Sequence, residues 1–216
     1  MKKTRYLSLG SPSGFIAFFG KQANKKYLIS FLNQLLPNGK VIHDLAYDEI
    51  TPPCPEEGVE GAAIGLHCDI GEEHQYLVDL QLPDKTNYPD WSIGSLSSLI
   101  CRYSHKLRDQ DPGAWIDYGI RNTNMIAILP FIDPHAPKGR YLSHAQFKEE
   151  KTGVILTDML AFTVIQLPNF RKTEHELETD LDRWLYLFCR KDLPEPVPSA
   201  LDCGIFPEIL SAMATP

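Results

Sequence analysis

QYLVDLQL, at residues 75–82, has the pattern of a β-strand, with an apolar side chain at every even position. Successive side chains on a strand point to opposite faces of its sheet, so Asp79 and Gln81 share the face away from these apolar residues. The preceding segment AAIGLHCDI reads as a second buried strand, and the glycine and two glutamates between the two favour an antiparallel hairpin. A carboxylate and an amide two residues apart on one strand supply half of a metal site.

The segments on either side of this hairpin extend the pattern to a helix-strand-strand-strand-helix-strand order over residues 22–132. The first helix is predicted at 24–40, where leucines and aromatics recur at helical spacing until PNG ends it. A short strand follows at 40–49. Residues 92–110 again have helical spacing, and 122–132 are apolar on both faces, as in a central strand.

The second part of the chain predicts one further strand and one further helix. DMLAFTVIQLP, residues 158–168, is the strand, and residues 173–191 are the helix, which a capping box of Thr173 with Glu176 would open. The proline-rich segment LPEPVPSAL then breaks the chain before a short apolar tail.

The composition suits a single α/β domain over residues 1–216, with its core at about 14–132 and a C-terminal strand–helix extension at about 140–216. A hydrophobic content of 43% is enough to fill a sizeable core. No stretch approaches the ~20 apolar residues of a membrane span. We therefore expect a cytoplasmic protein that does not enter a membrane.

The net charge of −7 and a pI of about 5.5 argue against a protein that coats nucleic acid nonspecifically, without excluding a local basic groove. The five cysteines are odd in number and form no CxxC pair, so they predict free thiols and neither a zinc site nor a disulfide framework.

Several longer phrases carry a family resemblance. They are GFIAFFGKQANKKYLISFLNQLLP, YLVDLQ, DMLAFTVIQLPNF and KTEHELETDLDRWLYLF. In this order, from about residue 5 to residue 210, they resemble the PD-(D/E)XK nuclease superfamily, and most closely its transposase-like, recombination-promoting branch. The resemblance implies a restriction-endonuclease-like fold, an α-β-β-β-α-β core whose mixed sheet is flanked by helices. It also implies a DNA endonuclease that uses Mg²⁺ or Mn²⁺.

Cleaving a phosphodiester requires charge neutralisation at the phosphate and a water of lowered pKa, and metal ions held by carboxylates supply both. In the branch that the chain resembles, an aspartate on the second strand and a glutamate on the third bind the metal, and a glutamine follows two residues later. By that resemblance Asp79 and Gln81 match the third strand. The strand-two aspartate falls on Gly65, which has no side chain to bind a metal.

Other charged positions of the family are also neutral in this chain. The resemblance places them at Pro12, Ile16, Gly94, Gln166 and Asn169, whereas Glu49 stands where the family has a glutamate. Because the apolar positions match while the charged ones do not, the pattern favours a retained fold with a lost or altered active site.

The candidate catalytic residues are accordingly Asp79, Gln81 and Glu49, and the candidate metal ligands are Asp79, Glu49 and Asp69. Each has an ordinary alternative: a polar groove wall for the first two, solvated surface for Glu49, and a turn or strand end for Asp69. Asp69 shares a face with Gly65 but lies about 13 Å along the strand, at ~3.3 Å per residue. His67, between them, is either a ligand or base or a hydrogen-bonded groove histidine.

Arg102, Lys106 and Arg108 on the second predicted helix are the candidate contacts to nucleic acid, whereas Lys21, Lys25 and Lys26 have the pattern of a solvated face. Three functions remain open. In the first, the chain is a metal-dependent endonuclease with residual activity that uses Mg²⁺ or Mn²⁺. Alternatively it is an inactive relative without a cofactor that binds nucleic acid, an active paralogue or another protein. The third is an interaction protein with no nucleic-acid role. The residues favour a degenerate nuclease.

Overall fold

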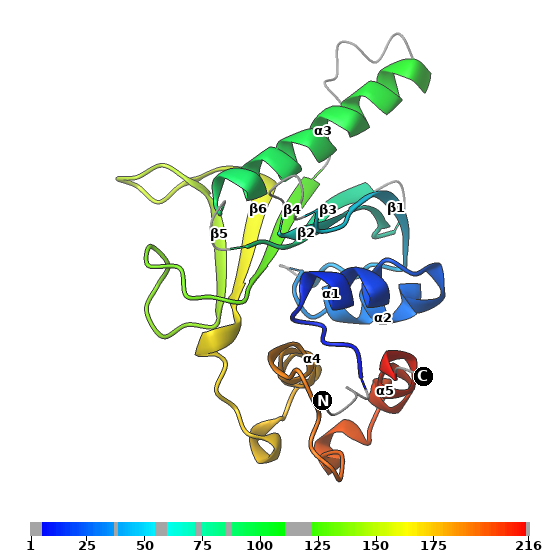
Figure 1. Ribbon diagram of the computed structural model, residues 1–216. Coiled ribbons are helices and arrows are strands. Elements are labelled where there is room, and N and C mark those ends of the chain that lie inside the picture. The colour runs from blue at the N-terminus through cyan, green and yellow to red at the C-terminus, as the bar shows by residue number, and fades with distance from the viewer. Residues whose placement is uncertain are drawn as a thin grey trace.

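The computed structural model describes residues 6–36, 39–54, 60–71, 75–84, 88–110 and 122–214, apart from the side chains of Gln75, Leu107, Arg108 and Gln110. In these residues a mixed six-stranded sheet lies between one long helix and a layer of four shorter α-helices (Figure 1). The elements are α1 (Pro12–Phe19), α2 (Lys25–Leu32), β1 (Asp44–Thr51), β2 (Ala62–Asp69), β3 (Gln75–Leu82), α3 (Asp90–Gln110), β4 (Asn122–Leu129), β5 (Leu142–Lys148), β6 (Ile155–Gln166), α4 (Asp180–Cys189) and α5 (Phe206–Met213).

The predicted α-β-β-β-α-β order is confirmed by the run from α2 to β4. The strands lie in the order β1-β2-β3-β4-β6-β5. The first three are antiparallel neighbours, β3, β4 and β6 run parallel, and β5 returns antiparallel at the edge. The expected α/β class and mixed sheet are therefore confirmed.

Two features of the second part of the chain differ from the sequence prediction. The predicted helix 173–191 is wrong at its start, because the capping box of Thr173 and Glu176 opens only a 3-10 turn. The helix α4 begins after a second capping box, formed by Thr179 and Asp182. The edge strand β5 was not predicted, because it is short, partly exposed and lacks a clear apolar alternation.

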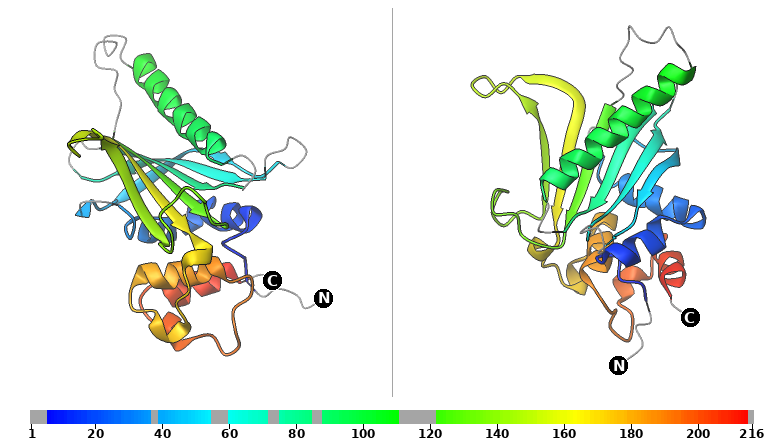
Figure 2. Two further views of the ribbon diagram at one scale, coloured as in Figure 1. Left: turned by 90° about the vertical axis from the view of Figure 1, so that its left-hand side faces the viewer. Right: turned by 45° about the horizontal axis from the view of Figure 1, so that its top comes forward.

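The two faces of β3 pack against different layers. Its even-numbered side chains join the main core with α1, α2, α4 and α5. Leu77 packs instead against Leu99 and Tyr103 of α3, and Asp79 and Gln81 share this face. The structure thus has the alternation that the sequence predicted. The long helix α3 covers one face of the sheet (Figure 2), and hydrogen bonds of Asp79 with Ser95 and of Gln81 with the Ser92 carbonyl place the two polar residues beneath it.

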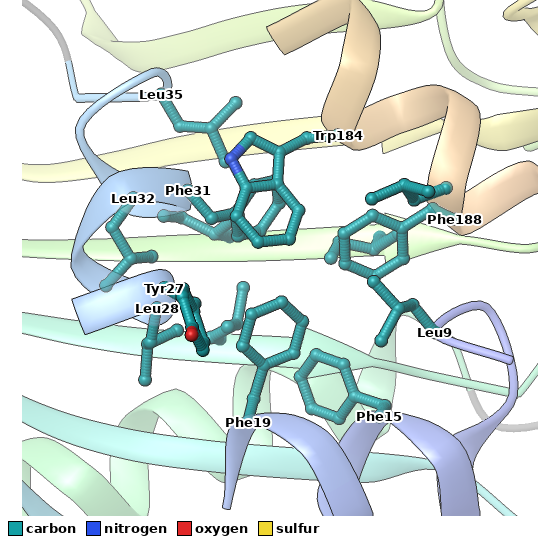
Figure 3. Close-up of a cluster of buried hydrophobic side chains, with 14 of the residues drawn as sticks. Leu9, Phe15, Phe19, Tyr27, Leu28, Phe31, Leu32, Leu35, Trp184 and Phe188 are labelled. Carbon is teal, nitrogen blue, oxygen red and sulfur yellow. The ribbon is translucent and has the colours of Figure 1, made fainter. Parts of the chain in front are cut away.

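The main core joins residues from the two ends of the chain. Trp184 and Phe188 of α4 lie against Phe19 of α1 and Phe31 of α2, with ring centroids 5.1–5.9 Å apart (Figure 3). The Leu7 amide donates to the Met213 carbonyl at 2.8 Å, so the two ends lie side by side. None of the helices in the described ranges is both long and apolar enough to cross a membrane.

Candidate active site

Three strands bring the candidate site residues into one row. Glu49 of β1 lies opposite Gly65 of β2, and Gly65 lies opposite Asp79 of β3. Helix α3 covers this row and leaves a pocket of about 380 Å³. The pocket is lined by Glu49, Thr51, Ala63, Gly65, Asp79, Trp91, Gly94, Ser95, Ser98 and Arg102.

A β-bulge in β1 sets the direction of its acidic residues. Leu45 and Tyr47 face the main core, and the register then shifts between Tyr47 and Glu49. Because a bulge places two residues opposite one on the partner strand, both Asp48 and Glu49 reach the α3 side, where each contacts Arg102. Strict alternation would have turned Glu49 toward the main core with Tyr47.

Asp79 is fully engaged by neighbouring donors. Gln81 Nε2 donates to its Oδ2 at 2.7 Å, and Ser95 Oγ donates to its Oδ1 at 3.2 Å. Burial raises the pKa of Asp79 to about 6, although these hydrogen bonds act to lower it. Gln81 is held in turn by donating to the Ser92 carbonyl at 2.9 Å.

Asp48 is the most heavily paired acid at the site, and sequence reasoning missed it. Its side chain is only 1% exposed. The carboxylate accepts hydrogen bonds from Arg102 Nε at 2.8 Å and from Lys106 Nζ, and it also pairs with His67 Nε2 at 3.0 Å. Burial by itself would raise the pKa of Asp48. The hydrogen bonds from Lys106, Arg102 and His67 outweigh burial and lower the pKa to about 2.

The predicted cations on α3 are therefore engaged with acids. Arg102 bridges Asp48 and Glu49, with Nη1 2.6 Å from the Glu49 carboxylate, and Lys106 pairs with Asp48. Arg108 lies in α3, but its side chain is outside the described residues. His67 has the hydrogen-bonded role that was one of its two interpretations.

The other sequence candidates lie away from the row. Asp69 is the last residue of β2, and its carboxylate accepts from the Gly71 amide at 2.9 Å, as a strand-end residue does. Gln166 and Asn169 donate to the Arg140 carbonyl and so hold a loop beside β6. Lys25 and Lys26 pair with Asp44 and Glu208, respectively.

The residues present do not fit a divalent metal ion. Within the described part of the chain, no group of three His, Cys, Asp or Glu side chains could hold one. Mg²⁺ needs oxygen ligands with near-octahedral geometry and loses its waters reluctantly. Here the Asp79 oxygens already accept hydrogen bonds, Glu49 is neutralised by Arg102, and Gly65 between them offers no oxygen from a side chain.

Sequence signals for the residues that were missed exist but are weak. Asp48 directly precedes Glu49, yet two adjacent acids on a strand normally point to opposite faces, so only the bulge makes both available. Ser95 is one of several serines in SIGSLSS, and the sequence pattern does not distinguish it from the others.

Comparison with known proteins identifies the family of the chain. The chain matches the family model described as PD-(D/E)XK nuclease family transposase over residues 13–212, which is nearly its whole length. PD-(D/E)XK nucleases generally depend on divalent metal ions and act on DNA. No curated protein and no solved structure matches the chain significantly. The family match and the sheet beneath α3 lead to one conclusion: the chain belongs to the PD-(D/E)XK nuclease family transposases and has their restriction-endonuclease-like α/β fold.

Proposed function

We propose that this chain is a catalytically degenerate relative of the metal-dependent DNA endonucleases and does not cleave DNA. One observation carries the proposal: Glu49 and Asp79 flank Gly65 in the row across β1, β2 and β3, so the middle carboxylate is missing. The remaining two acids already have protein partners, namely Arg102, Gln81 and Ser95. Two engaged acids offer little to offset the cost of dehydrating Mg²⁺.

A plasmid-nicking assay with Mg²⁺ or Mn²⁺ tests this proposal. The matched control is Asp79→Ala, which removes the acid at the position of the family's third-strand metal ligand. We expect the wild type and Asp79→Ala to leave supercoiled plasmid equally intact. Nicking by the wild type that disappears in Asp79→Ala would contradict the proposal, because it would mean that the acids of β1 and β3 still bind a catalytic metal ion.

The retained fold then serves binding, either to a nucleic acid or to a protein such as an active paralogue. The ion pairs of Arg102 and Lys106 favour the protein partner, since cations already paired to acids gain less from contacting phosphate. A cytoplasmic location is part of this proposal.

Size-exclusion chromatography of the chain mixed with a purified active paralogue checks the partner. We expect co-elution at micromolar concentration. Separate elution, together with tight binding of the chain to duplex DNA in EDTA, would favour the nucleic-acid alternative.

A further inference from the structure

Three basic side chains from two elements converge on one point in the structure. His67 of β2 and both Arg102 and Lys106 of α3 contact the single carboxylate of Asp48. The His67 and Arg102 contacts measure 3.0 and 2.8 Å. Two cations and an imidazole around one acid form a basic cradle, defined here as His67, Arg102 and Lys106.

The cradle has the chemistry of a phosphate-binding site. A guanidinium recognises phosphate through paired N–H donors, an ammonium supplies a point charge, and an imidazole adds a further N–H. An anion in such a cradle accepts from all three groups, as the Asp48 carboxylate does here. The carboxylate is therefore positioned as a stand-in for a phosphate group.

The exposures show that the cradle faces solvent and the acid does not. The Lys106 side chain is 54% exposed and that of Arg102 is 36% exposed, whereas the Asp48 side chain is 1% exposed. Arg102 also lines the pocket beneath α3. The acid is thus inserted from the sheet side, beneath cations that an outside ligand could otherwise reach.

Asp48 faces α3 by ordinary strand alternation, because its neighbours Leu45 and Tyr47 face the main core. The bulge then turns Glu49 to the same side, opposite Gly65. The Asp48 Cβ lies 3.7 Å from the position that a Cβ on Gly65 would take. This separation is an ordinary van der Waals contact, so positions 48 and 65 are direct neighbours on the α3 side. As a glycine, residue 65 brings no second carboxylate beside Asp48.

We propose that Asp48 is an internal anion that fills a phosphate-binding cradle made by His67, Arg102 and Lys106, and so keeps phosphate groups off this face. The inference deepens the proposed function, because it explains why the degenerate site also lacks free cations for a nucleic-acid backbone. A tethered carboxylate competes well, since it is present at a high effective concentration compared with a ligand in solution.

The first experiment measures duplex DNA binding by fluorescence anisotropy across a range of salt concentrations, in EDTA. Asp48→Asn keeps the size of the side chain and removes its charge. We expect it to bind the duplex more tightly than wild type, with a salt slope steeper by about 0.9, because Lys106 loses its acid whereas Arg102 keeps its ion pair with Glu49. Asp44→Asn is the matched control, since it makes the same charge change on the same strand and frees only Lys25 of α2. Because α2 lies on the opposite face of the sheet from α3 (Figure 1), we expect a smaller gain in affinity and in salt slope than for Asp48→Asn.

A duplex affinity of Asp48→Asn no greater than that of Asp44→Asn would overturn the proposal. A second variant needs no change at Asp48: Arg102→Gln with Lys106→Gln in the otherwise wild-type chain. The expected result is an unchanged affinity and salt slope, because both cations are masked. Weaker DNA binding by this variant would show that the cradle is already open, and would also overturn the proposal.

The source of the phosphate is distinguished by a thermal-shift titration of Asp48→Asn with inorganic phosphate. Stabilisation by phosphate that wild type does not show would assign the cradle to free phosphate as well as to a backbone. Tighter DNA binding without such stabilisation would assign it to nucleic acid alone. All of these binding measurements are made without metal ions. Metal-dependent nicking by the wild type would therefore contradict the proposed function without affecting the conclusion about the cradle.

Discussion

Asp48 and Asp79 lie on the same side of the sheet, are both buried, and have opposite pKa shifts. Asp79 is surrounded by neutral donors, so burial dominates and its pKa rises to about 6. Asp48 has charged donors, which outweigh burial and lower its pKa to about 2. The charged partners of Asp48 and the deeper burial of Asp79 together give the two pKa shifts opposite signs.

The raised pKa of Asp79 predicts that Asp79→Asn stabilises the protein at neutral pH. Between about pH 4 and pH 6 the folded chain holds a proton on Asp79 that the unfolded chain releases. Stability from this group is therefore fully present below about pH 3.8 and is lost as the pH rises through about 6. We expect Asp79→Asn to raise the free energy of unfolding at pH 7 by up to about 3 kcal/mol and to flatten its pH dependence.

Urea unfolding at pH 4, 5, 6 and 7 measures this effect. The Asp79→Asn side chain keeps both hydrogen bonds, since its amide oxygen can accept from Gln81 and the Ser95 hydroxyl can accept as well as donate. Asp69→Asn is the control: it makes the same change at an exposed strand end, where the acid accepts from the Gly71 amide, and we expect little effect. A loss of stability in Asp79→Asn at pH 7 would refute the argument.

The depressed pKa of Asp48 predicts the opposite pH dependence. Its contribution to stability is present above about pH 3.8 and is lost as the pH falls toward 2. We expect Asp48→Asn to be less stable than wild type at pH 7 and to approach it near pH 2, as measured by thermal unfolding. A difference that stays constant over this range would mean that the charge of Asp48 is not what stabilises the fold.

At the scale of elements, β1, β2 and β3 bring Glu49, Gly65 and Asp79 into one row beneath α3. A Cβ on Gly65 would lie 3.1 Å from Leu99 Cδ1, so a side chain fits once that methyl group moves slightly. A Cβ on Gly94 of α3 would meet none of the described heavy atoms within 4 Å. The space for the lost family side chains is thus still present.

This space predicts that Gly65→Asp combined with Asp79→Glu restores metal binding. The pair supplies the middle carboxylate and lengthens the third-strand acid beyond the reach of its present hydrogen bonds. We expect Mn²⁺ to stabilise the double variant by about 2.7 kcal/mol at a hundredfold excess over its Kd, and to leave wild type unchanged. A folded double variant whose melting temperature does not respond to Mn²⁺ or Mg²⁺ would count against our placement of the site.

At the scale of the whole molecule, the helices from the second part of the chain complete the core of the first. Trp184 is fully buried among Phe19, Phe31 and Phe206, which come from three other helices. Strand β6 also pairs directly with β4 in the sheet. We propose that residues 1–216 form one domain, because the core has no boundary at which the expected extension separates from it.

A single domain predicts one cooperative unfolding transition and a large effect of Trp184→Ala. Removing the indole from a filled core costs about 3–5 kcal/mol. We expect Trp91→Ala, which truncates a half-buried side chain at the pocket, to cost less. Urea unfolding followed by circular dichroism measures both. Two separate transitions, with Trp184→Ala shifting only one of them, would show two domains.

Local patterns were sufficient for much of this protein. The alternation in residues 75–82 placed Asp79 and Gln81 on one face, and helical and strand spacing predicted the order of elements from α2 to β4, but not α1, β5 or α5. The sequence also predicts that Gly65 stands at the strand-two ligand position of the family, and the structure places Gly65 opposite Asp79. Each of these features depends on residues that are close together in the chain.

The rest depended on contacts between distant residues. Arg102 meets Asp48 across 54 positions, and Lys106 meets it across 58. A bulge changes the register of a strand without leaving a mark in its apolar pattern, so the meeting of Asp48 and Glu49 on one face could not be read from LAYDEIT. The edge strand β5 forms because β6 offers it a partner. Periodicity reports what one element would bury, whereas pairing partners and local register follow from how the elements pack together.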